Sequence, residues 1–97
     1  MAANRIVCVE TEHPHRHIIA VGIGDNEWRA TRRETVATVR AAIRNGDRYY
    51  TVSPSKGWTA DVEPYDVYVN GQWIYTIRST PDAVPDNNLD NLRVCNW

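Results

Sequence analysis

The sequence contains no phenylalanine, although it has four tryptophans and five tyrosines. Every aromatic side chain therefore carries a polar atom, which needs water or a hydrogen-bond partner. Such rings favour half-buried positions, either at the rim of a core or on a binding surface. A small domain buries few side chains completely, and this explains the same composition without a binding surface. Both interpretations stay open from composition alone.

Long apolar runs are also missing from the chain. No stretch approaches the roughly 18 apolar residues of a membrane-spanning helix. No N-terminal segment combines a charged start, an apolar run and a small-residue cleavage site. We therefore expect a cytoplasmic protein with no membrane association. Cys8 and Cys95 are the two cysteines, and in a reducing compartment we expect two small buried thiols rather than a disulfide.

Concentrated charge and catalytic motifs are absent as well. The formal net charge is −1, which argues against a dedicated duplex binder, because such proteins carry a concentrated positive stripe. There is no nucleophile elbow, phosphate loop or paired zinc motif, so we predict no enzyme and no cofactor. Residues 1–97 are predicted to form a single domain, since two cores of about 50 residues would each be marginal.

The most informative pattern is the stretch Asp66–Trp73. Asn70 and Gly71 both tolerate the positive φ of a type I′ turn, so they predict a two-residue hairpin. This register places Tyr68 opposite Trp73, and period-two alternation then assigns every side chain to a face. The aliphatic face is predicted to hold Val67, Val69, Ile74 and Thr76. The aromatic face is predicted to hold Tyr68, Trp73, Tyr75 and Ile77.

The rest of the chain predicts further strands and one helix. Alternating or short apolar runs indicate strands at 5–12, 18–23 and 48–52, and an extended segment at 58–63. Thr31 and Glu34 form a capping-box pattern, and Asn45-Gly46 is a typical stop, so a helix is expected from Thr31 to Asn45. The predicted fold class is α+β, with an antiparallel sheet of about five strands and one helix packed on one face. The predicted buried residues are Ile6, Cys8, Ile19, Val21, Val36, Val39, Ile43, Val67, Val69 and Ile74.

Two groups of side chains are candidates for binding. Three arginines at helical spacing could hold phosphates or carboxylates, and the hairpin rings could stack on bases or pack against a protein. The candidate binding residues are Arg33, Arg40, Arg44, Tyr68, Trp73 and Tyr75. The alternative is an ordinary solvated helix face with half-buried rings.

A histidine cluster forms the third candidate site. His13, His15 and His17 alternate, so an extended backbone would project all three imidazoles to one side, where they could bind a divalent metal. The alternative is a solvated loop, in which His17 packs at the start of the next strand. We predict no bound metal, and we retain the cluster as a secondary hypothesis.

Several short segments also resemble a known family. They are Ile6–Val9, His17–Gly22, the helix ending at Asn45-Gly46, Tyr49-Tyr50, Tyr75–Thr80, Pro81-Asp82 and Asn87-Asn88-Leu89. Together they are similar to domain of unknown function 3892, over nearly the whole chain. The resemblance implies a compact α+β unit of the kind found in small bacterial, phage and mobile-element proteins. It assigns no catalytic residue, and its context implies an inhibitor of a host system.

These observations lead to one functional expectation and two alternatives. We expect a non-enzymatic binding module that holds a protein partner through the aromatic and arginine residues. The first alternative is a protein that binds a nucleotide or single-stranded nucleic acid. The second is a small metal-binding protein that uses the histidine cluster.

Overall fold

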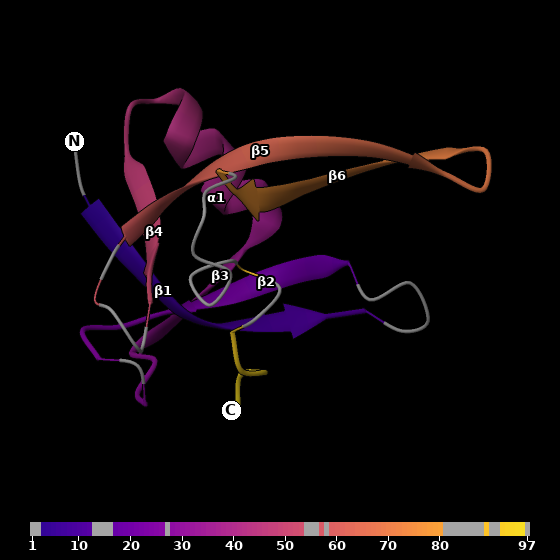
Figure 1. Cartoon of the computed structure of the whole chain (residues 1–97). Helices are drawn as coiled ribbons and strands as arrows, with labels where there is room; N and C mark the ends of the chain where they lie inside the picture. The colour runs from indigo at the N-terminus through magenta and orange to yellow at the C-terminus, as the bar shows by residue number, and fades with distance from the viewer. Residues whose placement is uncertain are drawn as a thin grey trace.

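The computed structural model describes residues 3–12, 17–26, 28–53, 57, 59–80, 89 and 92–96. Its elements are β1 (Ala3–Thr11), β2 (Ile18–Ile23), β3 (Arg32–Thr35), α1 (Val36–Arg44), β4 (Arg48–Val52), β5 (Thr59–Val69) and β6 (Gln72–Ser79). The strands form a six-stranded sheet in the order β3-β2-β1-β4-β5-β6, and α1 packs against it (Figure 1). The α+β class with one helix is therefore confirmed.

The predicted sheet of about five antiparallel strands was wrong in two respects. The part of the chain that the structure describes forms six strands, and β1 pairs with β4 in parallel. The parallel pair arises because α1 carries the chain back across the sheet before β4 begins, so β4 runs in the same direction as β1. The other neighbouring pairs are antiparallel.

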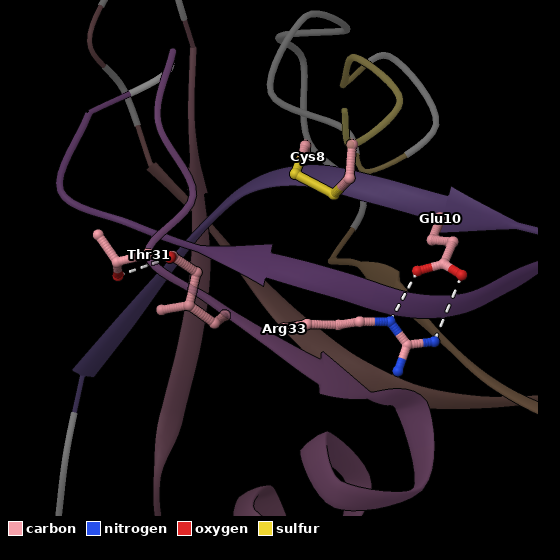
Figure 2. The surroundings of a disulfide bond; sticks show 6 residues. Cys8, Glu10, Thr31 and Arg33 are labelled. Atoms are coloured by element: carbon pink, nitrogen blue, oxygen red, sulfur yellow. Dashed lines mark hydrogen bonds and ion pairs between the residues drawn. A yellow bond between two sulfur atoms is a disulfide. The ribbon is translucent and has the colours of Figure 1, made fainter. Parts of the chain in front are cut away.

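The sixth strand, β3, replaces the predicted start of the helix. Residues 32–35 pair with residues 20–23 of β2, and the helix begins only at Val36. The predicted capping box does not form: Glu34 accepts hydrogen bonds from Tyr49 and Arg32, and Thr31 Oγ1 donates to the carbonyl of Ile23 (Figure 2). Extension along β2 gives the backbone of residues 32–35 sheet hydrogen bonds, which a first helical turn would lack.

Thr35 is the actual N-cap, because its Oγ1 accepts from the Thr38 amide at 3.2 Å. We expect Thr35→Ala to lower the free energy of unfolding by about 1 kcal/mol, through loss of that bond. Thr35→Ser keeps the cap oxygen and should remain close to wild type. Urea denaturation of the three proteins checks this expectation, and equal midpoints for the alanine and serine variants would contradict it.

The core lies between α1 and the sheet. Five of the predicted core residues are buried as expected: Ile6, Cys8, Val21, Val36 and Val39. The other five are only half-buried: Ile19, Ile43, Val67, Val69 and Ile74. Three of these five belong to the outer part of the β5–β6 hairpin, which extends beyond the rest of the sheet (Figure 1).

The C-terminal segment completes the sheet beside β1. Within the described ranges β4 pairs with β1 at residues 3–5. Residues 93–95 lie along the same edge of β1 farther on. The Val9 amide donates to the Arg93 carbonyl at 3.0 Å, and the Cys95 amide donates to the Val9 carbonyl at 2.8 Å. The end of the chain is thereby hydrogen-bonded to its first strand.

A disulfide between Cys8 and Cys95 fixes this arrangement (Figure 2). The expectation of two free thiols was wrong, although Cys8 is fully buried as expected. Gly22 on β2 lies directly against the bond, since a Cβ atom there would be 2.4 Å from Cys8 Sγ and 2.8 Å from Ala30 Cβ. Glycine at position 22 thus leaves the space that the disulfide occupies.

Candidate functional site

The β5–β6 hairpin projects from the body of the molecule as a two-stranded arm (Figure 1). Asn70 and Gly71 have φ of 52° and 80°, as a type I′ turn requires. The predicted register is confirmed, with Tyr68 opposite Trp73. Among the described residues, β4 pairs with β5 at residues 59–61. Residues 62–69 and 72–79 continue past that pairing, and we call them the arm.

The aromatic face of the arm is open to solvent. Tyr68, Trp73 and Tyr75 are 56%, 57% and 60% exposed, and the Tyr68 and Trp73 ring centroids are 5.3 Å apart. We call these three residues the aromatic patch. Ile77 shares their face by alternation but is buried in the core. The core therefore ends along this face between Ile77 and the patch.

Arg40 connects the helix to the arm at this boundary. Its Nη1 donates to the Thr76 carbonyl and pairs with Asp66 Oδ1, both at 2.9 Å. The guanidinium carbon lies 5.5 Å from the centre of the Tyr75 ring, in cation–π range. Arg40 is only 9% exposed. Arg40 is thus a structural tether that fixes one ring of the patch and shares its charge with Asp66.

The predicted line of three arginines along the helix was wrong. Arg33 lies on β3, where it forms two hydrogen bonds with Glu10 at 2.8 and 3.3 Å (Figure 2). The hydrogen bond and the charge of Glu10 raise the pKa of Arg33. Arg44 is exposed in the last turn of α1. Of these three arginines, Arg40 is the one that contacts a ring of the patch.

The opposite face of the arm borders a cleft of about 300 Å³ beside β2. Its lining residues are His17, Ile18, Tyr65, Val67, Thr76, Ile77 and Arg78. Thr76 Oγ1 donates to the Ile18 carbonyl at 3.1 Å, which ties the arm to β2. Arg78 lies 4.4 Å from the Tyr65 ring centre and pairs with Glu63 at 3.0 Å. The base of the arm is therefore held from both faces.

Sequence reasoning missed these contacts of Tyr65 and Arg78. The two residues belong to neighbouring strands, and the confirmed register sets them on one face of the arm. Cross-strand neighbours of this kind interact across a sheet. The hairpin register therefore carried the signal that could have found the pair.

The histidine cluster falls largely outside the described residues. His13 and His15 lie in the part of the chain that the structure does not describe. His17 Nε2 lies 2.9 Å from Glu12 Oε2. Within the described ranges, no group of three metal-ligating side chains comes together. The metal site stays a secondary hypothesis that the described residues do not test.

Comparison with known proteins gives the family and no activity. No curated protein and no solved structure matches the chain. Among the described residues, no helix has the length and apolar character needed to cross a membrane. A family model described as a protein of unknown function (DUF3892) matches residues 5–93. This match covers most of the sequence, and the chain belongs to the DUF3892 family.

Proposed function

We propose that this protein is a non-enzymatic binding module that holds a protein partner on the aromatic patch. The observation that carries the proposal is the joint exposure of Tyr68, Trp73 and Tyr75 on one face of a projecting arm. Tyrosine and tryptophan are enriched among residues that dominate binding energy at protein interfaces. They also present a large contact area with few rotatable bonds, so little conformational entropy is lost on binding.

The charges beside the patch favour a protein over a phosphate-bearing ligand. Arg40 already pairs with Asp66, and its side chain is buried. Arg33 pairs with Glu10 on a different strand. Binding of a nucleic acid draws much of its free energy from unpaired cations that neutralise phosphates. A nucleotide or single strand stacked on the patch therefore remains the alternative, with weaker support.

Fixed geometry at the base of the patch adds to this support. Tyr75 is held by the cation–π contact with Arg40, and the backbone of Thr76 accepts from the same guanidinium. Tyr68 and Trp73 contact each other. A surface that is ordered before binding loses less entropy when the partner docks. The patch is thus suited to a preformed interface.

The test compares loss of two patch rings with loss of an exposed tryptophan outside the arm. Trp73→Ala combined with Tyr75→Ala should abolish capture of the partner from a host lysate, measured by quantitative mass spectrometry. Trp28→Ala is the matched control, since Trp28 is 77% exposed outside the arm and its loss should leave capture unchanged. A partner that binds the double variant as well as wild type would contradict the proposal. Binding of nucleotides in a thermal-shift screen, weakened by added salt, would favour the alternative.

The family context and the disulfide bear on where such a module acts. Inhibition of a host system by a phage or mobile-element protein is the role that we propose within this binding function. The cytoplasmic location expected from the sequence is untested, and the disulfide weighs against it. Disulfides such as Cys8–Cys95 persist in oxidising environments and are rare in the cytosol, so this bond argues for an oxidising site of action.

A further inference from the structure

The two edges of the sheet differ in how they are protected against pairing with another chain. β3, at one edge, has four residues, of which Arg32, Arg33 and Glu34 are charged. Short length and charge are the usual protection of an exposed edge. β6, at the other edge, has eight residues, and its segment 72–77 contains no charged residue and no proline. The edge of β6 therefore lacks this protection.

The hairpin register shows which backbone groups of β6 point outward. In a two-residue turn the carbonyl of Val69 accepts from the amide of Gln72, so this pair is hydrogen-bonded. Pairs then alternate along an antiparallel ladder, which directs the amide and carbonyl groups of Trp73 and Tyr75 away from β5. The same alternation makes Pro64 and Ile77 a non-hydrogen-bonded pair. Proline suits this position, because it has no amide to donate.

These outward groups are unpaired in the described structure. Among the described residues, no backbone bond reaches the outer amide or carbonyl of Trp73 or Tyr75. Two donors and two acceptors are thus presented in a row on an uncharged strand. A row of this kind is a template for one more antiparallel strand.

We propose that this edge pairs with β6 of a second copy of the chain, in antiparallel orientation about a two-fold axis at Ile74. In this register Trp73 of one copy forms a hydrogen-bonded pair with Tyr75 of the other, and the reverse pair follows by symmetry. All four outward groups on each copy are then satisfied. This inference goes beyond the proposed function, because it uses the edge of the arm and leaves its aromatic face open.

The side chains and charges of the arm fit this occupant. On the half-buried face, Val67 and Ile74 are cross-strand neighbours, so the two-fold axis places a continuous row of four aliphatic side chains across both copies. On the other face, the two aromatic patches lie side by side and stay exposed, with each Trp73 opposite a Tyr75 of the other copy. No like charges face each other, because residues 72–76 are uncharged. Since this edge carries no charge, it does not call for a charged partner strand.

The test measures the oligomeric state of the purified full chain. Sedimentation equilibrium from about 10 µM to about 1 mM should show a monomer–dimer equilibrium in wild type. Tyr75→Pro removes the outward amide and leaves the bonds to β5 intact, whereas Tyr75→Ala removes the same ring and keeps the amide. Each symmetric dimer loses two hydrogen bonds in the proline variant. We therefore expect a dissociation constant about 10- to 100-fold higher than that of the alanine variant.

Two further measurements keep the outcome decisive if the proline variant unfolds. Ile74→Lys places like charges across the axis and should yield a monomer. In wild type, hydrogen exchange at the Tyr75 amide should slow as protein concentration rises. Three results would each overturn the proposal. The first is a wild-type protein that stays monomeric at the highest concentration, and the second is equal association of the proline and alanine variants. The third is hydrogen exchange at the Tyr75 amide that does not depend on protein concentration. None of these results touches capture of a protein by the patch, so the two proposals fail separately.

Discussion

Replacement of both Cys8 and Cys95 by alanine is expected to lower the free energy of unfolding by about 2–5 kcal/mol. The disulfide joins residues separated by 87 positions, so its loss frees nearly the whole unfolded chain from a cross-link. It also releases the C-terminal segment, which otherwise bonds to β1 through Val9. A loss of this size is a large share of the 5–15 kcal/mol typical of a native domain.

Chemical denaturation with and without reductant measures this effect. Wild type in reductant should approach the stability of the double variant, and reductant should not change the double variant. Val94→Ala is the matched control, because Val94 lies beside Cys95 but is 66% exposed and should change stability by less than about 0.5 kcal/mol. A reduced wild type that unfolds at the same denaturant concentration as the oxidised protein would contradict the prediction.

Loss of the Arg40 side chain should produce the second large effect. We expect Arg40→Ala to cost about 2–3 kcal/mol, because it removes the bonds to Asp66 and Thr76 and the contact with Tyr75. The estimate is below that for a fully buried ion pair, since the Asp66 side chain is 49% exposed. The arm should also become less ordered, because its tether to the helix is gone.

Urea denaturation gives the stability change, and amide hydrogen exchange along residues 72–76 gives the order of the arm. Arg44→Ala is the matched control, because Arg44 lies on the same helix with an exposed side chain and should shift stability by less than about 0.5 kcal/mol. Similar stability and similar exchange in the two variants would show that Arg40 does not tether the arm.

Features that depend on neighbouring residues could be predicted from the sequence. The register of the hairpin follows from Asn70-Gly71, because two adjacent residues with positive φ fix which side chains face each other. The buried positions Val36 and Val39 follow from helical spacing. Local geometry determines both, and the structure agrees with both. The exposure of the patch could not be predicted from local sequence, since it depends on where the helix ends relative to the arm.

The tertiary structure decided the features that depend on distant segments. Residues 32–35 were predicted to start the helix, but pairing with the edge of β2 makes them a strand. Cys8 and Cys95 become a disulfide only because the C-terminal segment lies beside β1. Arg40 was predicted to form one binding stripe with two other arginines, but the arm covers it and supplies Asp66 as its partner. In each case a contact far along the sequence determines the outcome, because local preferences are weak compared with tertiary contacts.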